Sequence, residues 1–382
     1  MGSRVKVGID LSPIGFRSRA PGTAVHVENQ ARALLKLDVE WQWVVVATPR
    51  VLRDTPFFQS FNPIVVGDAP LSYHVCCRLG GIWKRAGCSL GLATAFFAPF
   101  NGPPVVTNYF DANALHPVRD ERNVRERFKS RILRGLVEFS LRRSRALFID
   151  SDFGRVQMIA AHPATRSKWV VAPCGLPPVG PRPAQIPGWS KQLNGRPFIL
   201  YAGAFSENKN QRRLIEAWGK LRRRNEACPR LVLIGPTPES YLREVIEPAR
   251  ARTSHPQEII IPGFVPSEEV AWAYHAAHAY VQPSFAEGFG MPVIEAMSCG
   301  VPVACSDSTS LPEVAGDAAI LFDPLITESI SRALESLVFD ENRRTELRRL
   351  GFQRSSLFTW EQHATIVTKR IRQELNDILA AK

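Results

Sequence analysis

Two glutamates lie on either side of a glycine-rich corner in residues 285–296, which read FAEGFGMPVIEA. Glu287 comes directly before a Gly-Phe-Gly turn, and Glu295 falls in a helix predicted to begin near Pro292. Glycines let the backbone turn tightly and approach a ligand closely, and the free N–H groups at a helix start attract anions. Carboxylates accept hydrogen bonds from hydroxyl groups such as those of sugars. The corner predicts a ligand site held by both acids. The spacing alone is equally compatible with a surface acid at 287 and a helix-dipole partner at 295.

A longer segment around this corner resembles a known signature. Residues 283–324 read PSFAEGFGMPVIEAMSCGVPVACSDSTSLPEVAGDAAILFDP. This segment resembles the signature of glycosyltransferase family 4, the retaining nucleotide-sugar transferases of GT-B fold, whose E-x7-E pair falls on Glu287 and Glu295. The similarity continues through residues 198–218, 261–284 and 358–375, and more loosely through the first half of the chain, so it covers nearly the whole sequence.

The resemblance implies roles for the residues that match the motif. Glu295 is expected to bind the ribose hydroxyls of the donor, and Glu287 the hydroxyls of the transferred sugar. Lys209 is expected on the diphosphate, where a fixed cation stabilises the charge that develops on the leaving group. Phe264 and Val265 match the segment that flanks the nucleobase. The residues expected on the donor sugar and phosphates are Gly22, Thr23, Gly203, Lys209, Glu287, Gly288, Phe289, Gly290 and Met291.

Two positions depart from the family pattern. Family members often have an arginine just after the Tyr-Xaa-Gly strand end, where this chain has Ala204. Near the transferred sugar the family usually shows a His-Asp pair, whereas here Tyr109 and Phe110 occupy that place and Asp111 follows one residue later. Either Asp111 keeps the acidic role after a shift of one residue, or the site has lost its histidine. The expected catalytic residues are Glu287, Lys209 and Asp111.

Taken together, the resemblance implies an enzyme that moves a hexose from a nucleoside-diphosphate sugar to an acceptor hydroxyl with retention at the anomeric carbon, without a cofactor or metal. The EGFGMP variant favours a GDP-mannose-like donor. A cell-surface glycan or glycolipid is the first expectation for the acceptor, and a soluble small molecule is the alternative. A nucleotide-sugar epimerase and a degenerate sugar-nucleotide-binding subunit are the remaining alternatives.

Two alternating α/β domains would position these residues. The strands predicted from short apolar runs are residues 5–10, 43–47, 105–107, 146–150, 169–172, 198–202, 231–234, 258–261, 279–282 and 301–304, with helical segments between them, as in parallel sheets. Residues 173–197 are rich in proline and glycine and mark a linker. We predict an N-terminal Rossmann-like domain over 1–180, a linker over 181–196, a donor domain over 197–357, and a final helix over 358–382 that the resemblance places on the N-terminal domain. Such domains bind ligands in a cleft at the carboxyl ends of their strands.

The charge of the chain indicates which classes of partner it can bind, and its cysteine spacing bears on metal binding. The surplus of basic over acidic residues, 48 − 36 = +12, favours anionic partners. Much of it lies in a predicted helix over 119–145, which is best explained as a solvated helix packed on a core, with peripheral contact with an anionic membrane as the alternative. No nucleic-acid motif is present. No apolar run is long enough to span a bilayer, so we predict a cytoplasmic protein, with the inner face of the membrane as an alternative. The seven cysteines lack zinc spacing, and Asp150-Ser151-Asp152 is best explained by helix capping at Ser151.

Overall fold

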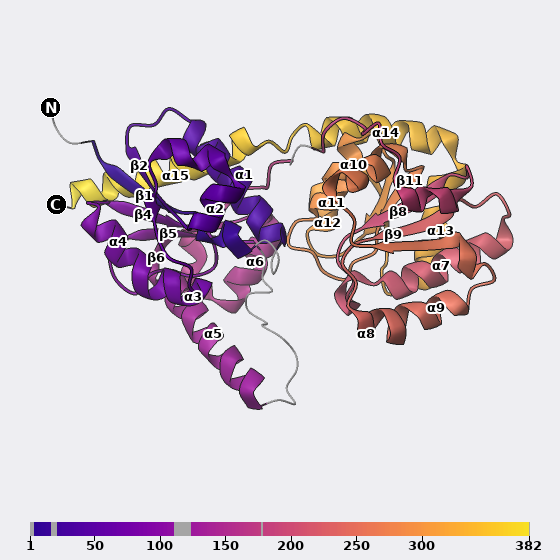
Figure 1. The fold of residues 1–382 in the computed structure, drawn as a ribbon, viewed down its shortest axis with the longest axis horizontal. Helices are drawn as coiled ribbons and strands as arrows, with labels where there is room; N and C mark the ends of the chain where they lie inside the picture. Colours follow the sequence, from indigo (N-terminus) through magenta and orange to yellow (C-terminus); the bar gives the residue numbers. More distant parts are fainter. Residues whose placement is uncertain (1–3, 17–20, 111–123, 177–178, 382) are drawn as a thin grey trace. The chain divides into compact units, whose positions relative to one another are not determined.

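A computed structural model describes residues 4–16, 21–110, 124–176 and 179–381. The chain divides into two compact units (Figure 1). The first comprises Met1–Gly175 together with Thr359–Lys382, and the second comprises Leu176–Phe358. The first crossing from one unit to the other falls within the proline- and glycine-rich segment 173–197. Each unit contains one parallel sheet flanked by helices, so the predicted α/β class with two doubly wound sheets is confirmed.

The sheet of the first unit has the order β3-β2-β1-β4-β5-β6-β7, with all neighbours parallel. Its strands are β1 (Lys6–Asp10), β2 (Gln42–Ala47), β3 (Ile64–Val65), β4 (Leu90–Ala93), β5 (Val105–Tyr109), β6 (Ser144–Ile149) and β7 (Trp169–Val171). The sequence predicted five of these strands and missed β3 and β4. The strand β3 is only two residues long, and β4 continues into an apolar run to Phe100 that gives no polar boundary.

Helices cover this sheet. The last helix, α15 (Trp360–Ala380), packs against α1 (Pro21–Lys36), although these segments lie at opposite ends of the sequence (Figure 1). The helices α4 (Gly80–Arg85), α5 (Val124–Arg143) and α6 (Asp152–Ala161) contribute to a hydrophobic core with the sheet. The remaining helices of this unit are α2 (Pro49–Asp54) and α3 (Leu71–Tyr73). The predicted cap of α6 is confirmed, because the Ser151 hydroxyl accepts from the Gly154 N–H at 3.1 Å.

The sheet of the second unit has the order β10-β9-β8-β11-β12-β13 and is also parallel throughout. Its strands are β8 (Phe198–Ala202), β9 (Arg230–Ile234), β10 (Ile259–Gly263), β11 (Ala279–Gln282), β12 (Val303–Ser306) and β13 (Ala319–Phe322). The sequence predicted all of them except β13, an edge strand in which residues 320 and 321 are not buried.

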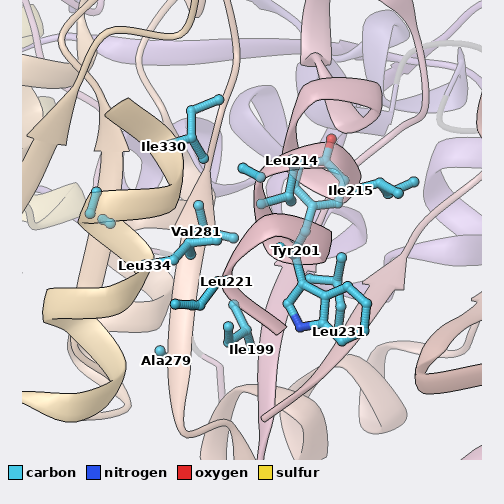
Figure 2. Close-up of a cluster of buried hydrophobic side chains, with 14 of the residues drawn as sticks. Ile199, Tyr201, Leu214, Ile215, Leu221, Leu231, Ala279, Val281, Ile330 and Leu334 are labelled. Atoms are coloured by element: carbon cyan, nitrogen blue, oxygen red, sulfur yellow. The ribbon is translucent and has the colours of Figure 1, made fainter. Parts of the chain in front are cut away.

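Two helical layers enclose this second sheet. On one face, α7 (Gln211–Arg224) and α13 (Thr327–Phe339) pack on β8, β9 and β11 through the buried side chains in Figure 2. On the other face lie α10 (Ser267–Ala276), α11 (Met291–Ser298) and α12 (Leu311–Ala315). The remaining helices are α8 (Glu239–Tyr241), α9 (Glu247–Ala251) and α14 (Glu341–Ser355). At the start of α10, Pro266 precedes Ser267, and the Ser267 hydroxyl donates to the Glu268 carboxylate at 3.3 Å and does not cap the helix.

Candidate functional site

The glycine-rich corner connects the carboxyl end of β11 to the start of α11. Gly290 is the residue before the helix and has a φ of 104°, a left-handed conformation that favours glycine. A Cβ at this position would also lie 2.6 Å from the Leu311 side chain, which would have to shift. Pro292 stands in the first turn, where its missing N–H is not needed. The corner therefore presents helix-start amides beside the strand ends, as predicted for an anion site.

Lys209 and Glu287 meet at this corner. Lys209 closes a short 3-10 turn (Glu207–Lys209) after β8, and its ammonium donates to both carboxylate oxygens of Glu287, at 2.8 Å to Oε1 and 2.7 Å to Oε2. The two side chains are 25% and 12% exposed, so the pair can still be reached from solvent. The structure thus brings together two of the three residues expected to be catalytic, although they are far apart in the sequence.

Backbone and amide hydrogen bonds hold the lysine loop against the corner. The Asn208 carbonyl accepts from the Phe285 N–H at 2.9 Å, and the Asn208 side chain donates to the Ala286 carbonyl at 2.8 Å. Asn210, in a left-handed conformation with φ 58°, donates from its buried amide to two proline carbonyls at 3.0 and 2.9 Å. Asparagine tolerates this conformation better than most residues, which explains its use between the loop and α7.

Two further polar residues orient the Glu287 carboxylate. The Gln282 amide and the Ser284 hydroxyl donate to Oε1 at 2.8 and 2.7 Å, and Gln282 in turn accepts from the Tyr280 hydroxyl. Within the part of the chain that the structure describes, Oε1 has three donors and Oε2 has only Lys209, so Oε2 keeps acceptor capacity for a ligand hydroxyl. The sequence analysis missed Gln282 and Ser284, which are buried in the structure. The available signal in the sequence was two polar residues at the end of an apolar strand.

Glu295 has a different partner. The Tyr274 hydroxyl of α10 donates to its Oε2 at 2.8 Å. Burial raises the pKa of Glu295, and the hydrogen bond from Tyr274 offsets part of that rise. Burial also raises the pKa of Tyr274, so the phenol remains the donor of this hydrogen bond. The two glutamates therefore occupy different settings, one facing a cation and the other a buried hydroxyl.

The other residues predicted for the second unit differ in exposure. Phe264 is 78% exposed and can offer its ring to a flat ligand, whereas Val265 is 7% exposed and belongs to the core. Gly203 follows β8 directly. At Ala204, where relatives often have an arginine, the backbone carbonyl accepts from Tyr201 and Gln211, each at 3.0 Å. A cationic side chain still reaches the carboxylate of the corner, because Lys209 pairs with Glu287.

In the first unit the predicted residues are placed as follows. Gly22 and Thr23 lie in the first turn of α1, not in a loop, because the helix already begins at Pro21. Proline suits this position, and the amides of the first turn have no intrahelical acceptor. Tyr109 is 1% exposed and its ring packs on Trp169 with 5.5 Å between centroids, so it is a core residue and does not take the place of the family histidine. Asp111 lies outside the described residues.

Comparison with known proteins identifies the family. The family described as "Glycosyl transferases group 1" matches residues 188–354, which contain the corner and Lys209. The O-antigen chain mannosyltransferase B of Escherichia coli is 32% identical over 276 residues, which cover 71% of this chain and 70% of that protein. The chain belongs to the group 1 glycosyltransferases. It is therefore an enzyme of the transferase class.

Two further proteins are similar to this glycosyltransferase, one over part of the sequence and one in fold. The serotype-specific mannosyltransferase WbdA of Escherichia coli is 30% identical over 167 residues, which are 44% of this chain and 20% of WbdA, so the match is to about a fifth of that larger protein. Anabaena HepE, solved in complex with UDP and glucose, superposes with a TM-score of 0.66 at 16% identity and covers 98% of this chain and all of HepE. The latter similarity shows the fold.

The helix α5 exposes basic side chains on the surface of the glycosyltransferase. Leu141 and Val137 of α5 are buried against the first sheet, whereas Arg131, Arg134 and Arg142 are exposed on the same helix. Ile132 is half exposed beside them. In the described ranges, every helix is too short or too polar to cross a lipid bilayer.

Proposed function

We propose that this glycosyltransferase moves mannose from GDP-mannose to a hydroxyl group of a growing glycan or glycolipid, with retention at the anomeric carbon and without a metal in the transfer step. The observation that carries the proposal is the Lys209–Glu287 pair at the helix start, within the segment that matches the family. The names of two relatives, both mannosyltransferases of Escherichia coli, support the choice of sugar.

The Lys209 ammonium has the donors that the leaving group requires. It carries three N–H bonds, of which two point to the Glu287 oxygens, so one remains for a diphosphate oxygen. Together with the α11 amides it stabilises the negative charge that develops as the bond from the sugar to the phosphate breaks. The departing phosphate oxygen then takes the proton of the acceptor hydroxyl as the new glycosidic bond forms on the same face of the sugar.

In this mechanism Glu287 positions the sugar and does not attack it. Both of its oxygens accept from Lys209, and Oε1 also accepts from Gln282 and Ser284, which lowers the nucleophilicity of the carboxylate. Retaining glycosidases instead place a free carboxylate against the anomeric carbon. The remaining capacity of Oε2 suits a hydroxyl of the transferred hexose.

Other residues are proposed to bind the ribose, the base and the phosphates of the donor. Glu295, held by Tyr274, is proposed to accept from the ribose hydroxyls, and the exposed Phe264 ring to stack on the base. In the first unit, the amides of Gly22 and Thr23 are proposed for the phosphates, and Asp111 for the acceptor or the transferred sugar.

Calorimetry with separate nucleotide sugars tests the site. GDP-mannose should bind more tightly than GDP-glucose or UDP-glucose, and Lys209→Ala and Glu295→Ala should each weaken binding. Lys220→Ala is the matched control, because Lys220 lies on α7 and pairs with Glu328 at 3.4 Å, away from the corner. Unchanged affinity in both site variants would remove the site assignment.

Product analysis tests the reaction. The anomeric configuration of the product, read by NMR, should equal that of the donor, and the rate should not depend on added Mg²⁺ or Mn²⁺. Inversion would contradict the mechanism, and an isomerised sugar nucleotide formed without acceptor would favour an epimerase. Transfer to a soluble small molecule but not to a glycan would replace the proposed acceptor.

Contact with a membrane is proposed from the exposed arginines of α5. Anionic vesicles should retain the enzyme at low salt and release it at high salt, because surface charge attraction is screened by ions. Neutral vesicles are the control. Absence of binding to anionic vesicles at low ionic strength would dispose of the proposal.

A further inference from the structure

Three side chains with metal-binding atoms converge inside the first unit, apart from the corner described above. His26 lies on α1, Asp150 directly follows β6, and Cys174 follows β7. His26 Nδ1 lies 3.2 Å from Cys174 Sγ and 3.6 Å from Asp150 Oδ2, and one ligand atom from each residue falls within 4.8 Å of the other two. All three residues are buried. From this cluster we infer a structural site for a divalent metal ion of the zinc type.

The distances fit three corners of a tetrahedral ion. Bond lengths of about 2.3 Å to sulfur and about 2.0 Å to nitrogen or oxygen give ligand-to-ligand edges of about 3.3–3.6 Å around zinc. The two edges that involve His26, 3.2 Å to sulfur and 3.6 Å to oxygen, lie within about 0.3 Å of this spacing. A Cys-His-Asp catalytic triad is a poorer explanation, because in a triad the imidazole contacts the nucleophile and the acid through different nitrogens. Here the same nitrogen, Nδ1, faces both the sulfur and the carboxylate.

The charges of the cluster also suit such an ion. A thiolate, a carboxylate and a neutral imidazole together balance a 2+ charge, so the occupied site would be neutral and could be buried without a large desolvation cost. Thiolate and imidazole ligands favour zinc over magnesium or calcium. Burial and the neighbouring Asp150 raise the pKa of the Cys174 thiol, so ion binding would release its proton to solvent.

Aromatic rings close the cluster off from water. The rings of Phe110 and Trp360 pack edge-on against His26, with centroids 4.6 and 5.1 Å away. Cys174 is followed by Gly175, where a Cβ would lie 2.3 Å from the Trp360 backbone nitrogen, so the chain passes closely by the start of α15. An ion here would tie α1 to the ends of β6 and β7, at the place where the chain leaves the first unit. Its role is stabilisation of this unit, and the transfer reaction needs no step through it.

Cobalt substitution tests the site in the full-length enzyme. Because the cluster is buried, the protein is produced in zinc-depleted medium with added Co²⁺, so that the ion can enter during folding. We expect a single cobalt per chain, a near-ultraviolet band from charge transfer between thiolate and cobalt, and intense visible bands typical of tetrahedral geometry. Enzyme produced with zinc in place of cobalt should lack these bands and should melt at a higher temperature than enzyme produced without either metal. No thiolate band in the unmodified chain would overturn the inference.

Substitutions locate the ion. Cys174→Ser should abolish the thiolate band, and Asp150→Asn should weaken cobalt binding about tenfold or more, by analogy with losses on altering metal sites. Cys228→Ser is the control, since Cys228 is equally buried but lies in the second unit. A band that persists in Cys174→Ser would place the ion elsewhere. If Cys174→Ser does not fold, X-ray absorption on the zinc-loaded unmodified enzyme decides: one sulfur among lighter ligands supports the site, and any other sulfur count overturns it.

Discussion

In the second unit, the ion pair beside the strand ends keeps part of its surface exposed, whereas the cluster beside the strand ends of the first unit is sealed in the interior. Lys209 and Glu287 form an ion pair that solvent reaches. His26, Asp150 and Cys174 instead lie beneath aromatic rings, with each residue buried. Lys209 and Glu287 follow parallel strands, and so do Asp150 and Cys174, so topology alone does not separate the two groups.

The difference shows how burial assigns roles to similar chemical groups. An exposed ion pair with spare hydrogen-bonding capacity can exchange contacts with a ligand. A buried cluster can accept an ion only if the charges balance inside it, and it otherwise serves to hold elements together. A second buried group of polar side chains in the first unit also holds elements together through hydrogen bonds. Asn108 donates to Gln30 at 2.6 Å, and Gln30 lies 2.8 Å from the His363 imidazole of α15.

The largest effect is expected for Lys209→Met. Removing one preorganised donor from a developing anion typically lowers kcat by about 100- to 1,000-fold, and we expect a loss of this size in kcat/KM for transfer. The melting temperature should change little, because the pair is partly exposed. Lys220→Met serves as the control in the same assay. A loss below about tenfold would mean that the exposed pair does not contact the leaving group.

Gln30→Leu should lower the stability of the enzyme and leave donor binding unchanged, the opposite of Lys209→Met. The side chain of Gln30 is fully buried, and its loss leaves the Asn108 amide and the Nε2 atom of His363 without this partner, at a cost of about 3 kcal/mol in the free energy of unfolding. Donor affinity should stay unchanged. Urea denaturation and calorimetry measure the two quantities, and Asn29→Ala, on the half-buried side of α1, is the control. Weaker donor binding without destabilisation would mean that this buried group serves ligand binding and does not hold the first unit together.

Asn210 allows a test within the second unit. Asn210→Ala removes hydrogen bonds to the Pro283 and Pro324 carbonyls and strains a left-handed backbone, so we expect about 2 kcal/mol of destabilisation and a several-fold loss of activity through a displaced Lys209. Asn210→Gly separates the two causes, because glycine relieves the backbone strain only. Equal stability of the alanine and glycine variants would assign the whole effect to the hydrogen bonds.

The smallest effect concerns Glu295 and pH. Its carboxyl pKa in the folded state is raised, so the stability that it contributes is lost as pH rises through that pKa. Glu295→Gln keeps an acceptor for Tyr274 and removes the buried charge. The variant should therefore melt higher than the unmodified enzyme at pH 8, with the difference vanishing in acid, while donor affinity falls. Thermal melts across pH check the sign, and a variant less stable at pH 8 would contradict it.

Prediction from the sequence succeeded where the pattern was local. The strands 198–202 and 279–282 were found with their observed bounds, and the cap at Ser151 was correct, because apolar runs bounded by turn residues need no tertiary information. The prediction failed at β3, β4 and β13, where strands are very short, merge into longer apolar runs or lie at an edge. The sequence analysis explained Asp150-Ser151-Asp152 by capping at Ser151 and assigned no partner to either aspartate. In the structure Asp152 pairs with Arg155 at 2.7 Å on α6, and Asp150 faces His26.

The sequence by itself determined two α/β units and the corner with its helix start, since glycine positions, proline positions and apolar spacing act over a few residues. Only the tertiary structure decided which side chains meet across long separations: Lys209 with Glu287, Tyr274 with Glu295, and His26 with Asp150 and Cys174. Parallel strands bring their carboxyl ends to one edge of a sheet, and the packing of helices on that sheet then fixes which of the gathered groups remain open to solvent.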